Sequence, residues 1–156
     1  MKKQLNNKSY LTAISRRKLS VPMQYLADNN LLKSDMLDYG CGRGGDSLNL
    51  TSVLGDDFVC WKYDPHYQPK EFDPTRCSFD VITCHYVLNV VDVAEGKKIL
   101  KKIKALLADN GTAYITVRRN IKKEGFTSKG TYQRNVKLKL PVVTENSSFC
   151  IYKLTK

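Results

Sequence analysis

The sequence predicts an α/β fold with a mostly parallel sheet that ends in an antiparallel hairpin. Short apolar segments alternate with segments of helical period between residues 35 and 117, which is typical of parallel strands joined by helical crossovers. A glycine-rich turn at residues 40–45 follows the first predicted strand. Two strands joined by a short polar turn close the chain at residues 136–154 and predict the antiparallel edge.

The N-terminal part of the chain predicts two short helices. Residues 1–9 are polar and are expected to be flexible, whereas residues 10–156 are expected to form a single domain, because the chain is too short for two cores. The helices are expected within residues 10–32. The second of them begins at Ser20, since Pro22 falls in its first turn, where a proline removes no needed hydrogen bond.

The central elements follow from the spacing of apolar residues. Helices are expected at residues 44–54 and 94–108. The first is expected to turn Leu48, Val53 and Leu54 inward, and the second carries an apolar stripe with lysines on its remaining face. The strands are rich in β-branched and aromatic residues and are expected at residues 35–38, 58–63, 79–84, 112–117, 136–143 and 148–154.

The composition argues against a membrane protein and against a disulfide-rich one. No apolar run approaches the roughly 18 residues of a membrane span, and the N-terminus lacks the apolar stretch of a signal peptide, so a cytoplasmic location without a membrane partner is expected. The five cysteines lack CxxC spacing, so we expect neither a disulfide framework nor a metal site. The net charge of +11 favours phosphate-rich or acidic partners.

The glycine-rich turn predicts a nucleotide-type cofactor and is compatible with two kinds. Gly40, Gly42 and Gly45 match the G-x-G-x-x-G pattern of dinucleotide sites. Gly40, Gly42 and Gly44 match the G-x-G-x-G pattern typical of enzymes that use S-adenosylmethionine. Cys41 is interpreted as a small residue of this turn, placed against the cofactor.

Two carboxylates help to decide between these cofactors. A dinucleotide would place its pyrophosphate on the turn, where the Asp38 carboxylate would repel it. S-adenosylmethionine has no phosphate and carries an ammonium and a sulfonium, which the carboxylate favours. Asp64 ends the next strand and can accept hydrogen bonds from both ribose hydroxyls of either cofactor. In the alternative interpretation, Asp38 only caps the turn and Asp64 only precedes a proline turn.

Three segments resemble those of the class I S-adenosylmethionine-dependent methyltransferases. Residues 37–46 are similar to motif I of that class, residues 79–91 to its fourth-strand segment, and residues 106–112 to the turn before its fifth strand. The resemblance implies a compact Rossmann-like sheet, S-adenosylmethionine as the cofactor, and cofactor contacts at Asp38, Gly40, Gly42 and Gly44.

A closer resemblance is to the methyltransferase family found with DNA phosphorothioation systems. It spans about residues 11–134 and consists of five segments in order, at residues 12–16, 38–44, 64–67, 86–90 and 130–133. The methyl acceptor of that family is poorly defined, so the resemblance implies the fold and the cofactor rather than the substrate.

The chain departs from the class in its middle. Only 15 residues separate Asp64 from Asp80, where the class usually has a helix, a strand and a second helix. We therefore expect a proline-bearing loop and a reduced third-strand region, which leaves the adenine contact unassigned. Tyr67, which follows Asp64, is interpreted as an aromatic wall beside the cofactor.

His85 is the candidate catalytic residue. It lies just past the end of the third predicted strand, where a methyl acceptor would approach and where it would also border the cofactor. A neutral imidazole there can act as a general base if the acceptor must lose a proton. The alternative is a histidine with a packing or hydrogen-bonding role.

A basic rim is expected around the cleft. Candidate substrate contacts are Arg16, Arg118, Arg119, Lys129 and Tyr132, with aromatic rings between the charges that could stack on bases. The alternative is that these are solvated loop charges.

The sequence therefore predicts a methyltransferase that uses S-adenosylmethionine, with nucleic acid as the favoured acceptor and a small molecule or protein as other possible acceptors. The rival interpretation is a module that keeps the cofactor fold, has lost methyl transfer, and binds nucleic acid or a partner protein. A dehydrogenase is a more distant third.

Overall fold

A computed structural model describes residues 8–156, so most of the predicted flexible segment 1–9 lies outside the described residues. Six strands form the main sheet in the order β2-β1-β3-β4-β8-β7. β1 (Met36–Tyr39), β2 (Cys60–Tyr63), β3 (Phe79–His85) and β4 (Leu107–Arg118) are parallel, whereas β7 (Val142–Glu145) and β8 (Phe149–Thr155) form the antiparallel edge. The predicted fold class is confirmed.

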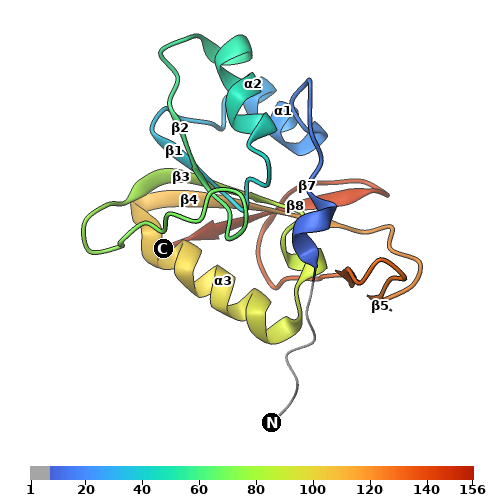
Figure 1. Ribbon diagram of the computed structural model, residues 1–156. Helices are drawn as coiled ribbons and strands as arrows, with labels where there is room; N and C mark the ends of the chain where they lie inside the picture. The colour runs from blue at the N-terminus through green and yellow to red at the C-terminus, as the bar shows by residue number, and fades with distance from the viewer. Residues whose placement is uncertain (1–7) are drawn as a thin grey trace.

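Helices cover both faces of this sheet (Figure 1). On one face lie α1 (Val21–Asp28) and α2 (Gly45–Leu54), over a core that includes Met23, Met36 and Leu50. On the other face lies α3 (Val93–Leu106), whose stripe of Ile99, Ile103 and Leu106 packs on a second core. Among the described residues, no helix is both long and apolar enough to cross a membrane.

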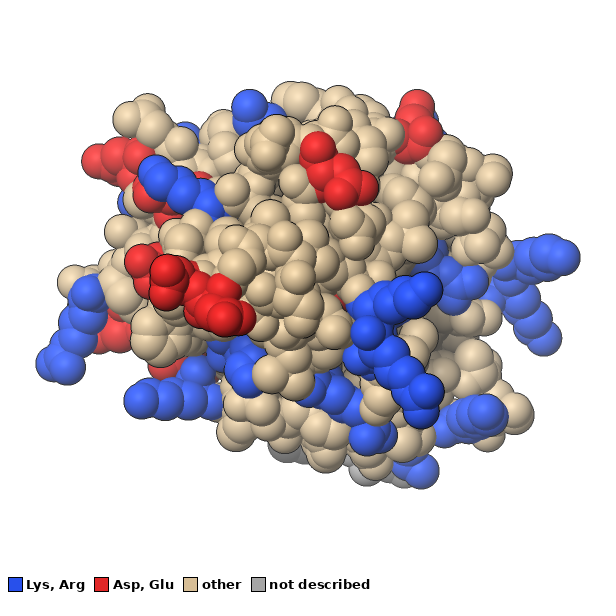
Figure 2. All heavy atoms as spheres, turned by 90° about the horizontal axis from the view of Figure 1, so that it is seen from above, with Lys and Arg blue, Asp and Glu red and all other residues tan. Residues whose placement is uncertain are grey.

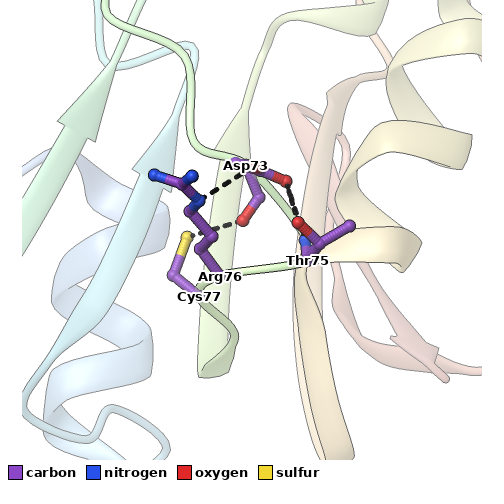
Figure 3. Close-up of polar contacts among 4 residues, drawn as sticks. All are labelled: Asp73, Thr75, Arg76 and Cys77. Atoms are coloured by element: carbon purple, nitrogen blue, oxygen red, sulfur yellow. Dashed lines mark hydrogen bonds and ion pairs between the residues drawn. The ribbon is translucent and has the colours of Figure 1, made fainter.

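The segment between β2 and β3 has neither a helix nor a named strand, as the short spacing predicts. Asp64 and Gln68 form an isolated bridge at its start. Near its end, the Asp73 carboxylate accepts hydrogen bonds from the backbone N–H and the hydroxyl of Thr75, and it lies 3.7 Å from Arg76 (Figure 3). The Cys77 thiol donates to the Asp73 carbonyl. These local bonds give the loop a defined shape without a crossover helix.

Two predicted details of the core and the C-terminal hairpin are wrong. Leu48, Val53 and Leu54 are 66%, 47% and 39% exposed, and the buried leucine of α2 is Leu50. The strand predicted at residues 136–143 begins only at Val142, because the chain bends at residues 139–140 and Pro141 has no N–H to donate to a neighbouring strand. Before this bend, Val136 packs into the α3-side core.

Three short elements complete the fold. A 3-10 turn, η1 (Ser9–Thr12), precedes α1, and a second, η2 (Leu88–Val90), follows β3. A separate two-stranded sheet, β5 (Gly125–Phe126) with β6 (Tyr132–Gln133), forms inside the polar segment after β4. Figure 1 draws this hairpin at the end of the molecule where η1 lies.

Candidate functional site

The carboxyl ends of β1, β2 and β3 open into a cleft of about 710 Å³. Parallel strands present these ends at one edge of the sheet, so residues distant in sequence meet there. The predicted site residues that line the cleft are Arg16, Asp38, Gly40, Cys41, Gly42, Asp64, His85, Arg118 and Tyr132. The others lie outside its lining: Gly44, Tyr67, Arg119 and Lys129.

The glycine turn is fastened to the end of β2. Gly40 and Gly42 have φ of +79° and +55°, in the left-handed region that favours glycine. The N–H groups of Gly40 and Cys41 both donate to the Tyr63 carbonyl, at 2.7 and 2.9 Å. Burial raises the pKa of the Cys41 thiol far above its usual range, so this cysteine is no thiolate nucleophile.

Asp38 places a buried carboxyl group in the cleft. Its side chain is only 3% exposed, and its Oδ1 accepts a hydrogen bond from the Thr83 hydroxyl at 2.9 Å. Burial, followed by the neighbouring Asp46 carboxylate, raises the pKa of Asp38 to about 7, although the Thr83 bond lowers it. A bound cation would favour the ionised form again, so this carboxylate is suited to a positively charged ligand.

Asp64 joins the two loops that border the cleft. Its Oδ2 accepts from the Gly42 N–H at 3.0 Å, and its Oδ1 accepts from the N–H groups of His66 and Tyr67, both at 2.9 Å. A carboxylate offers about four acceptor sites. The remaining capacity therefore suits one ligand hydroxyl better than the two that the sequence predicts.

Asp46 is a cleft residue that the sequence analysis missed. Its two carboxylate oxygens accept hydrogen bonds from the N–H and the hydroxyl of Ser20, at 2.7 and 2.6 Å. The Ser20 hydroxyl in turn accepts from the Met23 N–H at the start of α1. Asp46 thus joins the first turn of α2 to that of α1 and places a second carboxylate near Asp38. The only sequence signals for this contact were a serine at the start of one helix and an aspartate in the first turn of the next.

His85 lines the cleft and has one buried ring nitrogen without a hydrogen-bond partner among residues 8–156. Its Nδ1 lies 2.7 Å from the Thr116 hydroxyl, and its buried Nε2 has no hydrogen-bond partner among the described residues. Burial lowers the pKa of His85 to about 4, against an opposing effect of Asp46. The imidazole is therefore neutral at physiological pH, where it can accept a hydrogen bond but is a weaker base than an exposed histidine.

The chain before α1 forms one wall of the cleft, where the sequence analysis predicts Arg16 but not Tyr10. The Tyr10 ring stacks on His66 with centroids 4.1 Å apart, and the Tyr67 hydroxyl donates to the Tyr10 carbonyl at 3.1 Å. Arg43 lies 5.3 Å above the Tyr67 ring. Tyr67 thus holds the N-terminal wall in place from outside the cleft, while His66 reaches its lining.

Asn89 fixes the opposite wall. It is 1% exposed, its Nδ2 donates to the Arg134 carbonyl at 2.9 Å, and its Oδ1 accepts from the Arg118 N–H at 2.7 Å. The Arg134 N–H returns a bond to the Asn89 carbonyl. One side chain therefore joins η2, the end of β4 and the residues after β6.

We expect Asn89→Ala to lower the free energy of unfolding by roughly 1–3 kcal/mol, because it leaves the Arg118 N–H and the Arg134 carbonyl, both in part-buried bonds, without their partner. Urea denaturation measures the change. The control is Asn29→Ala, which removes a single hydrogen bond from an exposed helix end and should cost less than about 1 kcal/mol. Equal losses in the two variants would contradict the assigned role of Asn89.

The predicted basic rim is only partly gathered at the cleft. Arg16, Arg118 and Tyr132 line it, and the Arg118 Nε donates to Asn120 at 3.1 Å. Arg119 instead forms an ion pair with Glu145 at 2.7 Å on the antiparallel edge. Lys129 is exposed beyond β5. Residues from the loop after β4 thus supply one end of the cleft, opposite the segment around Asp64.

Comparison with known proteins yields a family and a fold. The sequence profile of a methyltransferase domain family matches residues 11–138, and no curated protein matches. The precorrin-6y C5,15-methyltransferase of Geobacter metallireducens is 10% identical with a TM-score of 0.50, over 95% of each chain. The S-adenosylmethionine-bound amino pentose methyltransferase of Micromonospora echinaspora is 19% identical with a TM-score of 0.46, over 67% of this chain and 54% of that one.

The chain spans about half the length of the amino pentose enzyme and of a protein from echinomycin biosynthesis. At these identities the structural likeness concerns the fold alone. The sequence profile extends from the N-terminal wall of the cleft through the turn at Gly40 to the residues after β6, and so includes nearly every element that builds the site. On this evidence the chain belongs to the methyltransferase domain family.

Proposed function

We propose that the chain binds S-adenosylmethionine in this cleft and transfers its methyl group to an acceptor that enters beside His85. The observation that carries the proposal is the buried Asp38 carboxylate, which lies in the cleft under a turn of left-handed glycines. A buried carboxylate without a cationic protein partner suits an ammonium or a sulfonium and disfavours a pyrophosphate. Asp64 and the turn residues Gly40, Cys41 and Gly42 would complete the cofactor contacts, and Gly44 would act by starting α2.

The cofactor would supply an electrophilic methyl group on a cationic sulfur. In the transfer the sulfur–methyl bond breaks, the acceptor–methyl bond forms, and the sulfur leaves as a neutral thioether. The chain's own contribution is to align donor and acceptor and to exclude water. Where the acceptor loses a proton, His85 would take it: the imidazole lines the cleft and is neutral, and its Nε2 has no hydrogen-bond partner among the described residues.

Isothermal titration calorimetry with S-adenosylmethionine tests the proposal first. We expect saturable binding near one site per chain, and weaker binding of an analogue whose methionine amine is removed. An absence of binding to the folded protein at millimolar ligand, together with tight NAD binding, would overturn the assignment in favour of a dinucleotide site.

His85→Asn is expected to lower the methyl-transfer rate by roughly 100-fold or more, while the dissociation constant for S-adenosylmethionine changes little. Asparagine keeps a polar side chain near Thr116 and cannot act as a general base. The measurement pairs a labelled-methyl assay on DNA, RNA and cell extract with calorimetry. An unchanged rate would assign His85 a packing role.

Nucleic acid is the acceptor class that we propose, on the strength of the net charge of +11 and of the likeness to the family found with DNA phosphorothioation systems. An intracellular location is part of the same proposal. The second candidate is a module that binds the cofactor without transferring methyl groups, and the reduced segment between β2 and β3 favours it. Cofactor binding without labelled-methyl transfer to any acceptor in the survey would support that candidate.

A further inference from the structure

The segment after β4 is the most positively charged part of the chain. Residues 118–139 contain eight Lys or Arg and a single acid, Glu124, whose carboxylate accepts a bond from the Asn135 N–H. Lys122, Lys123 and Lys129 are exposed, and none of them forms an ion pair within residues 8–156. In Figure 2, Lys and Arg side chains gather along the right of the face shown, the side on which Figure 1 draws the β5 hairpin.

An aromatic pair leads from this surface into the cleft. Phe126 is 46% exposed, and its ring lies 5.3 Å from that of Tyr132, which lines the cleft. The interplanar angle of 57° leaves the rings tilted rather than stacked. The outer ring therefore presents apolar surface to solvent beside three unpaired lysines, a combination that suits an unstacked base with its phosphates.

Hydrogen bonds within the hairpin and to its neighbours fasten it beside the cleft. The Thr127 N–H donates to the Thr131 carbonyl at 2.7 Å, and the hydroxyls of these two threonines lie 2.6 Å apart. Gln133 Nε2 donates to the Lys123 carbonyl at 2.8 Å. Through Arg134, the residue after β6, the hairpin is also joined to Asn89 in η2. A surface that is already ordered loses little entropy when a ligand binds.

We propose that the β5–β6 hairpin binds single-stranded nucleic acid, with one base stacked on Phe126 and the backbone along Lys122, Lys123 and Lys129. This rests on the proposed function and narrows its acceptor from nucleic acid in general to an unpaired strand. A paired duplex keeps its bases stacked on each other and offers no free face to Phe126, whereas an unpaired base costs little to place there.

Fluorescence anisotropy tests the proposal with labelled oligonucleotides of about 12 nucleotides, as single-stranded DNA, single-stranded RNA and the matching DNA duplex. We expect the single strands to bind more tightly than the duplex. Phe126→Ala should weaken single-strand binding by roughly 10-fold, and Phe126→Trp should retain it. The triple variant Lys122→Gln, Lys123→Gln and Lys129→Gln should bind with a weaker salt dependence. The slope of log affinity against log salt concentration should become less negative by about 2.

The matched control removes three exposed lysines from α3, as Lys97→Gln, Lys98→Gln and Lys101→Gln, with the same change in net charge. If both triple variants weaken binding equally, or if Phe126→Ala has no effect, the hairpin proposal is overturned. Calorimetry with S-adenosylmethionine separates the hairpin proposal from the proposed methyl transfer. Cofactor binding without oligonucleotide binding overturns the hairpin proposal alone. If the protein does not bind S-adenosylmethionine but binds single strands in a way that depends on Phe126, the result supports the hairpin proposal and contradicts the proposed methyl transfer.

Discussion

Asp38→Asn is expected to weaken S-adenosylmethionine binding by roughly 10- to 100-fold at pH 8, the effect of losing a hydrogen bond to a charged group. Asparagine has almost the same shape and can still accept the bond from the Thr83 hydroxyl, so the cleft keeps its form. What disappears is the negative charge that the ligand cation would compensate. The two cationic groups of the cofactor are the reason to expect so large a loss from a change of one atom.

The same substitution is expected to stabilise the cofactor-free protein above pH 7. The pKa of Asp38 is about 7 in the folded chain and near its ordinary value of 3.8 in the unfolded chain. Between these values the folded state binds more protons than the unfolded state, so stability falls as the pH rises through this window. The ionised buried carboxylate then costs up to about 4 kcal/mol at pH 8, and the asparagine variant avoids this cost.

Binding by the unchanged protein should depend on pH for the same reason. A cation beside Asp38 favours its ionised form, so binding releases a proton near pH 7, and affinity should rise as the pH increases from 6 to 8. Calorimetry of S-adenosylmethionine binding in buffers of different ionisation enthalpy measures the number of protons released.

Asp35→Asn is the control for these measurements, because Asp35 is exposed and asparagine tolerates its φ of +64°. It should change neither stability nor affinity. If Asp38→Asn binds the cofactor as well as the wild type does, or is no more stable than wild type at pH 8, the electrostatic account of the cleft fails.

The convergence of Asp38, Asp64 and His85 was predictable from the sequence, because each lies at or just past the carboxyl end of a parallel strand. Parallel strands share one carboxyl edge, so knowing the strands is enough to place these residues together. The same logic does not give the bonds that each side chain makes. Asp64 is used mainly to fasten two loops, and this depends on the path of the segment after β2 rather than on any local pattern.

The error in α2 shows where periodicity fails. At about 100° per residue, Leu48 lies roughly 160° from Leu50 around the helix, so the apolar residues of this helix do not share one face. The buried side is chosen instead by Asp46, whose bonds to Ser20 turn that side of the helix toward α1. A polar contact between residues 26 positions apart decides the orientation, and no window of local sequence contains it.

The sequence predicts a basic and aromatic rim from residues 118–135, but it predicts neither the position of Tyr10 nor the β5–β6 hairpin, for a related reason. Tyr10 reaches the cleft through His66 and Tyr67, and the chain between them contains two strands and two helices. Residues 118–135 have no clear period, and their hairpin is fixed by Asn89 from another element. Both features depend on tertiary contacts between segments that lie far apart in the sequence.

Gly40→Ala is expected to destabilise the protein by roughly 2–5 kcal/mol, which combines left-handed strain with overpacking. The φ of Gly40 is +79°, which disfavours any side chain, and an added Cβ would lie 2.3 Å from Val87 Cγ2. Because Val87 lies between β3 and η2, relief of this clash would displace the chain that follows His85. Loss of cofactor binding should therefore accompany the lower melting temperature.

Two further variants separate the strain from the clash. Gly130→Ala has nearly the same φ, +78°, but its nearest neighbour is Lys8 Cδ at 3.5 Å, so it should show the strain alone. Combining Gly40→Ala with Val87→Ala removes the overlap and should recover the larger part of the stability that Gly40→Ala loses beyond Gly130→Ala. Thermal unfolding of the wild type, the two single variants and the double variant measures the cost of the backbone strain and the cost of the clash with Val87. If Gly40→Ala costs no more than Gly130→Ala, Val87 does not require glycine at position 40, and the turn is held only by its backbone conformation and its bonds to Tyr63.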